Sequence, residues 1–133
     1  MVFRTLVVAL IGTAITQMPM SPADVQAHRS RMIATQLLEQ KVENALAARS
    51  RRTAAAGARD LVPILEKEQQ YWDRTGVEDA MMFAERNLGT AKRLADVTKR
   101  GDLAKAGFEL DALRANCVAC HGRHPDTRVH VGR

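Results

Sequence analysis

Residues 103–121 read LAKAGFELDALRANCVACH, and this stretch decides how the chain folds. Apolar residues recur in it at intervals of three and four, which is the period of one face of an α-helix. The two cysteines continue this stripe beyond the leucines, so the face that packs into a core ends in two thiols. The stripe consists of Leu103, Ala106, Leu110, Leu113, Cys117 and Cys120. The pattern therefore predicts a helix that builds the group held by these thiols into the core.

The end of this stretch, Cys117-Val118-Ala119-Cys120-His121, has the Cys-x-x-Cys-His pattern by which c-type haem is attached. On a helix the two sulfurs, three residues apart, leave the same face and can bond the two vinyl groups of one porphyrin. His121 follows directly, so its imidazole can ligate the iron. The chain has no other cysteine. The motif predicts one covalent haem c per chain, held by Cys117, Cys120 and His121.

Three other uses of these residues stay open. A thioredoxin-like dithiol sits at the start of a helix after a strand, where its thiol pKa is lowered, and no strand is predicted here. A zinc site would use Cys117, Cys120, His121 and His124, and would need the adjacent Cys120 and His121 to bind one ion. The third use is a structural disulfide. Haem attachment explains both cysteines and the histidine together and is the favoured interpretation.

The start of the chain is typical of a secretion signal, which we assign to residues 1–20. Arg4 supplies the positive charge, and residues 5–15 form an apolar run of about ten residues, shorter than the roughly twenty of a membrane-spanning helix. Cleavage between residues 14 and 20 is favoured over a site after Ala27, and an uncleaved membrane anchor is the alternative. A cleaved secretion signal predicts that the protein is periplasmic and has no stable membrane span after processing. It agrees with the haem motif, because c-type attachment in bacteria is completed outside the cytoplasm.

Length and composition favour a single helical domain. The chain has 133 residues, few aromatic side chains (4%) and a formal net charge of +5. Loss of Arg4 and the two propionates of a haem would reduce this mild charge, so nucleic acid is not needed to explain it. A local run of basic residues is either a solvated connection, which we favour, or a surface that steers an acidic redox partner. Its members are Arg49, Arg51, Arg52 and Arg59.

Two helices are predicted before residue 73. The first covers residues 22–48 and begins at Ser21 as N-cap, with a broad apolar stripe that includes Ile33 and Leu37. The second lies within residues 53–72, and Pro63 predicts a kink or a late start near Asp60.

Two further helices complete the domain. The sequence Thr75-Gly76-Val77-Glu78 predicts a capping box that opens a third helix, extending to about residue 99. Asp102 is predicted to cap the fourth helix, which ends just after His121. Short links between four helices predict an all-α, up-down-up-down antiparallel four-helix bundle with covalent haem near the C-terminus. The haem-binding domain would cover residues 21–124, followed by a flexible tail at 125–133.

This arrangement resembles the cytochrome c prime family, including its low-spin, methionine-ligated relatives. The resemblance covers the four helices and rests on Cys117 to His121 at the end of the last helix and on the turn Gly101-Asp102 before it. It implies that His121 is the proximal ligand and that the first helix supplies the distal face. Family members often dimerise through the first helix, which implies a homodimer. Where the family often has an aromatic residue and an arginine, this chain has His124 and Pro125.

The resemblance also implies a sixth ligand. In the family an arginine is commonly followed four residues later by the distal residue. Arg29 stands four residues before Ile33, and Met32 lies one residue earlier. Arg29 would then serve the propionates or the distal pocket, and Met32 would be the second metal ligand beside His121. An open site beside Ile33, a histidine ligand, and Met32 as ordinary core packing remain alternatives.

The other histidines and methionines are expected to be structural or exposed. His28 lies four residues before Met32 and offers a bis-histidine site, but an exposed first-turn histidine is favoured. His124 and His130 are expected in solvent, Met81 in the core and Met82 at the surface.

These residues predict a periplasmic cytochrome that transfers single electrons to redox partner proteins. The alternative is a five-coordinate haem protein that binds nitric oxide or carbon monoxide, and a thiol–disulfide enzyme is a weaker third. No nucleophile–base pair, paired-carboxylate site or phosphate loop is recognisable, so the chain is not expected to be an enzyme.

Overall fold

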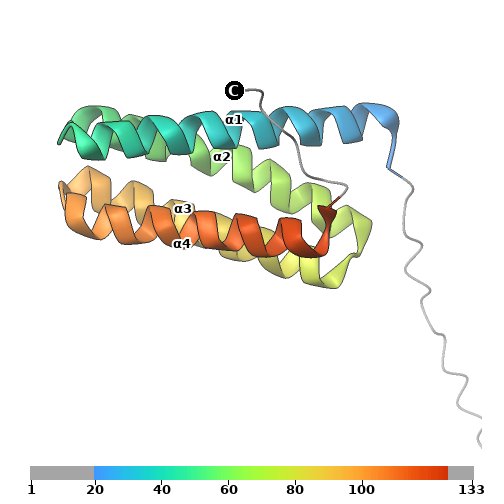
Figure 1. Ribbon diagram of the computed structural model, residues 1–133. Helices are drawn as coiled ribbons and strands as arrows, with labels where there is room; N and C mark the ends of the chain where they lie inside the picture. The colour runs from blue at the N-terminus through green and yellow to red at the C-terminus, as the bar shows by residue number, and fades with distance from the viewer. Residues whose placement is uncertain (1–19, 126–133) are drawn as a thin grey trace, which may run out of the picture.

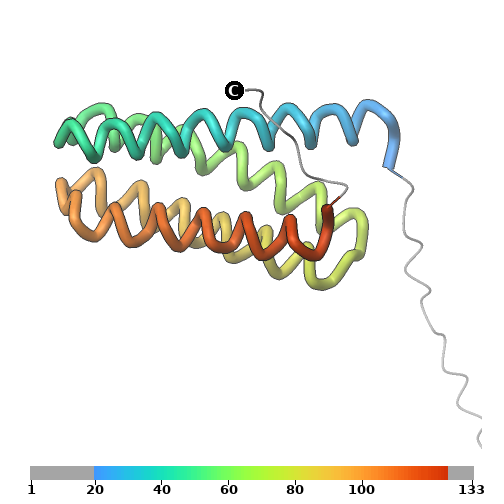
Figure 2. Tube along the Cα trace, in the orientation of Figure 1, coloured from blue at the N-terminus to red at the C-terminus, as the bar shows by residue number. Residues whose placement is uncertain are grey.

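The computed structural model describes residues 20–125, and these residues form α-helices and turns without a strand. The helices are α1 (Pro22–Ala47), α2 (Arg51–Thr75), α3 (Glu78–Arg100) and α4 (Leu103–Arg123). Each helix runs back along the one before it, so the chain passes up and down the bundle (Figures 1 and 2). The predicted all-α four-helix bundle is confirmed. Of the predicted signal at residues 1–20, residues 1–19 lie outside the described part, and so do residues 126–133, which include His130.

The bundle is packed unevenly around its circumference. Extensive contacts join α1 to α2, α2 to α3 and α3 to α4, whereas α1 and α4 touch only sparsely. Aliphatic side chains fill one half of the interior, and this cluster includes Val42, Leu61, Leu94, Val97 and Leu110, each at most 3% exposed. A smaller cluster around Tyr71 and Trp72 closes the opposite end. No helix in the described range is long and apolar enough to cross a membrane.

Two of the predicted helix caps are confirmed. The Ser21 hydroxyl accepts a hydrogen bond from the Asp24 amide at 3.1 Å and thereby begins α1. The Asp102 carboxylate accepts one from the Lys105 amide at 3.0 Å and begins α4. The preceding Gly101 has φ +82°, a conformation that glycine adopts without steric cost.

The predicted boundary at Thr75 is wrong. Thr75 ends α2, because Gly76 at φ +68° forms a left-handed C-cap, and its amide donates to the Trp72 carbonyl. The Thr75 hydroxyl donates to that same carbonyl at 2.7 Å. Val77 is therefore the N-cap of α3 and contributes no side-chain hydrogen bond.

Of the kink or late start predicted for the second helix, the late start is wrong. α2 begins at Arg51 and contains Pro63 within it. Pro63 is exposed, so the carbonyl at residue 59, which loses its helical partner, can be hydrated instead.

The orientation predicted for the first helix needs correction. Ile33 is 36% exposed and Leu37 is 59% exposed, so neither belongs to the buried face. The buried residues of α1 are instead polar as far as Glu39 and become apolar at Val42 and Ala45. The buried polar residues are His28, Thr35 and Glu39. Hydrophobic periodicity did not reveal this face because its buried polar side chains line a cavity rather than an apolar core.

Candidate functional site

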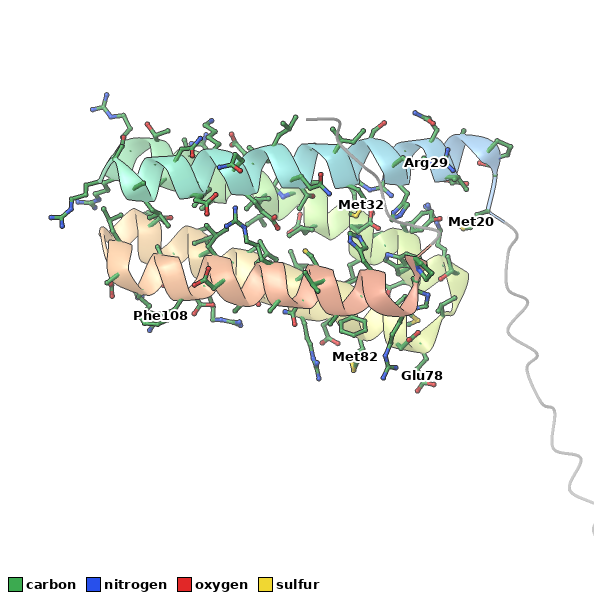
Figure 3. The ribbon with its side chains drawn as sticks, viewed as in Figure 1. Met20, Arg29, Met32, Glu78, Met82 and Phe108 are labelled. Carbon is green, nitrogen blue, oxygen red and sulfur yellow. The ribbon has the colours of Figure 1, made fainter. Side chains whose placement is uncertain are left out.

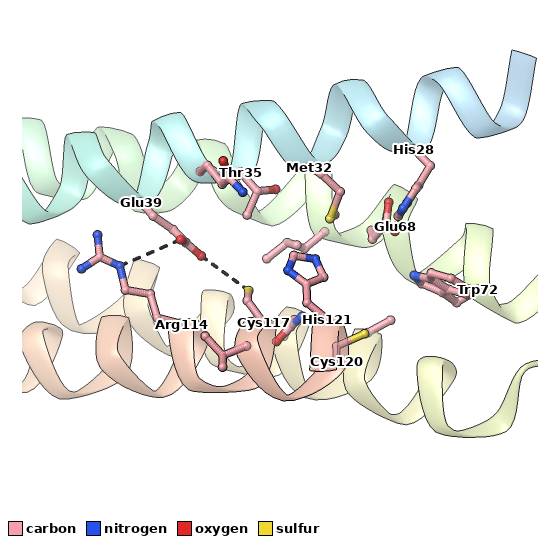
Figure 4. A pocket seen from close by; sticks show the side chains of 15 residues that line it. His28, Met32, Thr35, Glu39, Glu68, Trp72, Arg114, Cys117, Cys120 and His121 are labelled. Carbon is pink, nitrogen blue, oxygen red and sulfur yellow. Dashed lines mark hydrogen bonds and ion pairs between the residues drawn. The ribbon is translucent and has the colours of Figure 1, made fainter. Parts of the chain in front are cut away.

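A cavity of about 300 Å³ lies between α1 and α4, two helices that touch only sparsely, and residues of α2 and α3 complete its wall. Cys117, Cys120 and His121 of α4 all line it, and Met32 of α1 lines the opposite wall. Figure 4 shows the His121 ring and the Met32 sulfur pointing toward each other. The two cysteines are free thiols and half-buried. Four of the five predicted site residues are therefore gathered at one cavity.

Arg29 is the predicted site residue that the structure places elsewhere. It is exposed on α1 and is absent from the cavity wall. Arg114 of α4 does line the cavity, and its guanidinium forms hydrogen bonds of 2.8 and 3.0 Å with the two carboxylate oxygens of Glu43. Arg114 lies one turn before Cys117 and borders the cavity, as Arg29 was predicted to do. Its place on the face shared with Cys117 was the available signal.

The cavity wall carries polar atoms that have no partner. His28 Nε2, Thr35 Oγ1 and Asn87 Oδ1 are buried and form no hydrogen bond within the described residues, and all three residues line the cavity. Buried polar atoms in folded proteins are nearly always satisfied, so these three atoms around one space are available to a bound molecule or to ordered water.

The chemistry of the wall fits a haem group. Apolar side chains that exclude water stand beside the thiols and the imidazole, and these include Leu65, Trp72 and Ala84. The volume lies at the lower end of the range for sites that bind small molecules and cofactors.

Burial keeps the two thiols protonated. Burial raises the pKa of Cys117 well above its usual value, and the Glu39 carboxylate, which accepts a hydrogen bond from the thiol at 3.7 Å, adds to the effect. Burial raises the pKa of Cys120 to about 11, with a further contribution from Asp79. A thiol–disulfide enzyme requires a thiolate near neutral pH, so this environment disfavours that alternative.

Glu39 is a buried acid that the sequence analysis did not select. It is 8% exposed and lines the cavity. Burial raises its pKa, although Arg114, at 3.9 Å, opposes the shift. Its spacing of seven residues from Met32, two turns along one helix face, was the signal that could have identified it.

The expectations for two histidines are wrong. His28 is only 3% exposed, because it pairs with the buried Glu68 and stacks on Tyr71. His124 is half-buried, with its Nε2 at 3.1 Å from Asp79 Oδ1 and its ring against Trp72. The expectations for Met81 and Met82 are confirmed, since Met81 packs against the Trp72 cluster and Met82 is 38% exposed and points outward (Figure 3).

Among residues 20–125, no three His, Cys, Asp or Glu side chains are arranged to hold a metal ion by themselves. No protein-family model, curated protein or solved structure matches this chain. The site must therefore be interpreted from its own residues.

Proposed function

We propose that this protein is a periplasmic c-type cytochrome that carries one haem and transfers single electrons. The observation that supports the proposal is the convergence of the Cys-x-x-Cys-His motif with Met32, from opposite helices, on one cavity. The motif alone would be compatible with several uses of two thiols. The methionine facing the imidazole adds the donor pair of an electron-carrying haem.

Each site residue has a distinct role in this proposal. Cys117 and Cys120 would hold haem through thioether bonds, and His121 and Met32 would bind its iron. When bound, haem supplies the iron that takes up and releases one electron. The helices α1 and α4 would bring these two ligand residues to the iron from opposite walls of the cavity. A thioether ligand also raises the reduction potential relative to a second imidazole.

The partner surface is expected near the cavity rather than at the basic run. Arg49, Arg51 and Arg52 lie at the turn from α1 to α2, at the end of the bundle far from Cys120 (Figure 1). Arg51 is also engaged within the fold, because its guanidinium donates to the Lys99 carbonyl at 2.6 Å. Electron transfer slows steeply with distance, so a redox protein should approach the edge between α1 and α4.

The test is an absorption spectrum of the protein exported together with haem-attachment machinery, recorded oxidised and reduced. We expect a sharp, split, low-spin reduced spectrum that carbon monoxide leaves unchanged, and haem that stays with the polypeptide on a denaturing gel. A polypeptide without attached haem would refute the proposal. A high-spin spectrum that shifts with carbon monoxide would replace electron transfer by the binding of diatomic gases.

A further inference from the structure

His28 is held in the wall of the cavity by an acidic side chain from the neighbouring helix. Its Nδ1 lies 2.5 Å from Glu68 Oε1, and the other oxygen of Glu68 accepts a hydrogen bond of 2.8 Å from Arg31 Nε. His28 and Glu68 are each 3% exposed. Because a carboxylate oxygen accepts, the Nδ1 of the neutral ring carries the proton, and Nε2 carries the lone pair.

Aromatic neighbours fix the orientation of this imidazole. The Tyr71 ring stacks on His28 with a centroid distance of 4.7 Å and an interplanar angle of 10°. The Trp72 ring meets it edge-on at 5.5 Å. The ring is therefore held by one hydrogen bond and two ring contacts, so its free nitrogen has a defined direction.

The free nitrogen has no partner, although it is buried. His28 Nε2 forms no hydrogen bond with any residue of the described range, and His28 lines the cavity that His121 enters from the other side. An imidazole whose one nitrogen donates to a carboxylate while the other is free is the arrangement that orients histidine ligands of metals. The carboxylate fixes the tautomer and leaves Nε2 as the nitrogen that faces a ligand.

His28 and Met32 offer two ligands from one helix face. They are four residues apart on α1, so both side chains leave the helix on the same side, and both line the cavity (Figure 4). They differ in mobility, since methionine has a flexible side chain and His28 is held by Glu68, Tyr71 and Trp72.

We propose that His28 Nε2 is an alternative axial ligand that binds the haem iron when Met32 leaves it. This inference rests on the proposed function, because it requires a haem attached at Cys117 and Cys120. It assigns the cavity two low-spin states, one with histidine and methionine as axial ligands and one with two histidines. The second state has the lower reduction potential, because a methionine ligand raises the potential.

The test compares holoproteins of the parent, of Met32→Ala and of Met32→Ala/His28→Gln, each exported with haem-attachment machinery. We expect Met32→Ala to stay low-spin, to lose the sulfur-to-iron charge-transfer band and to have a lower potential. The double variant, in which glutamine can still donate to Glu68, should become high-spin and bind carbon monoxide. A high-spin Met32→Ala protein, or a double variant that stays low-spin, would overturn the inference.

A second measurement needs no substitution at His28. Pulsed electron paramagnetic resonance on oxidised Met32→Ala, labelled with ¹⁵N-histidine, counts the imidazoles bound to the iron. Two coupled histidine nitrogens support the inference, and one overturns it. Both outcomes presuppose attached haem. If the parent chain carries none, the proposed function fails and this inference with it, whereas attached haem with a single imidazole refutes the inference alone.

Discussion

The two halves of the bundle are built from the same four helices but have different interiors. One half, which we call the aliphatic half, is filled by Val42, Leu61, Leu94, Val97 and Leu110. The other, the cavity half, contains the site, where buried acids, two imidazoles and two thiols line the cavity. In the aliphatic half these apolar side chains pack against one another.

The cavity half lowers the stability of the folded chain when no molecule is bound in it. Each buried polar atom that lacks a partner costs about 1–3 kcal/mol, and His28 Nε2, Thr35 Oγ1 and Asn87 Oδ1 are three such atoms. The aliphatic half offsets this cost. The comparison teaches that stability and ligand chemistry are separated along the bundle axis, so substitutions in the two halves should have different consequences.

The largest effect is expected at the thiols. Replacement of Cys117 and Cys120 together by serine removes both sulfurs that can form thioether bonds, so covalently attached haem should be lost completely. The matched control is Ala119→Ser, which places a hydroxyl at an exposed position between them. Haem staining of denaturing gels measures the result. Attached haem in the double serine variant would contradict the assignment of Cys117 and Cys120 as the residues that hold haem in the cavity half.

The next largest effect is expected in the aliphatic half. Leu94 is fully buried, so Leu94→Ala should lower the free energy of unfolding by about 2–5 kcal/mol. Leu37→Ala on the exposed face of α1 should change it by less than about 0.5 kcal/mol. Denaturant titrations measure both values. The absorption spectrum of Leu94→Ala should match that of the parent, and a shifted spectrum would contradict the separation of the halves.

A smaller effect is expected where α1 and α2 approach each other closely, at Val42 and Gly57. A Cβ at Gly57 would lie 2.9 Å from Val42 Cγ2, so Gly57→Ala should lower the free energy of unfolding by about 1–3 kcal/mol. A Cβ at Gly107 of α4 would meet no atom within 4 Å. Gly107→Ala should therefore stabilise the protein by about 0.5–1 kcal/mol, the usual gain in a helix interior. If both variants changed the free energy of unfolding in the same direction, the close approach of Gly57 to Val42 would be contradicted.

The aliphatic half could be predicted from the sequence, whereas the cavity half could be predicted only in part. The stripe from Ala106 to Leu113 gave the buried face of α4, because apolar periodicity directly reflects packing. The inward face of α1 could not be found in this way. His28 and Glu39 look like surface residues until Glu68 and Arg114, from other helices, are brought beside them.

The motif residues were predictable for a different reason. Cys117, Cys120 and His121 lie within five positions, so their common face follows from helix geometry alone. Arg29 was selected by spacing within a family pattern, and the structure places it on the exposed side of α1. Contacts across helices decide which arginine borders the cavity, and these contacts depend on the whole fold.

The smallest effect separates two acids that share Arg114. Burial raises the pKa of Glu39, so its ionised form is disfavoured by folding, and stability falls as the pH rises from 4.5 toward the raised pKa. The hydrogen bonds from Arg114 lower the pKa of the exposed Glu43, so the stability from that pair is present above pH 4.5 and is lost as the pH falls. The two carboxylates therefore contribute to stability with opposite sign.

This opposition can be measured with matched substitutions in one haem state. Glu39→Gln should raise the free energy of unfolding at pH 7 by about 1 kcal/mol, because it removes a buried charge while Arg114 keeps Glu43 at 2.8 Å. Glu43→Gln should lower it at pH 7. The Glu39 difference should shrink as the pH falls below 4.5, where this carboxyl group becomes neutral in both states, and the Glu43 difference should shrink as the pH falls through its lowered pKa. Denaturant titrations across this pH range test both signs. A loss of stability in Glu39→Gln equal to that in Glu43→Gln would show that the buried carboxylate is supported by Arg114 rather than penalised by the cavity.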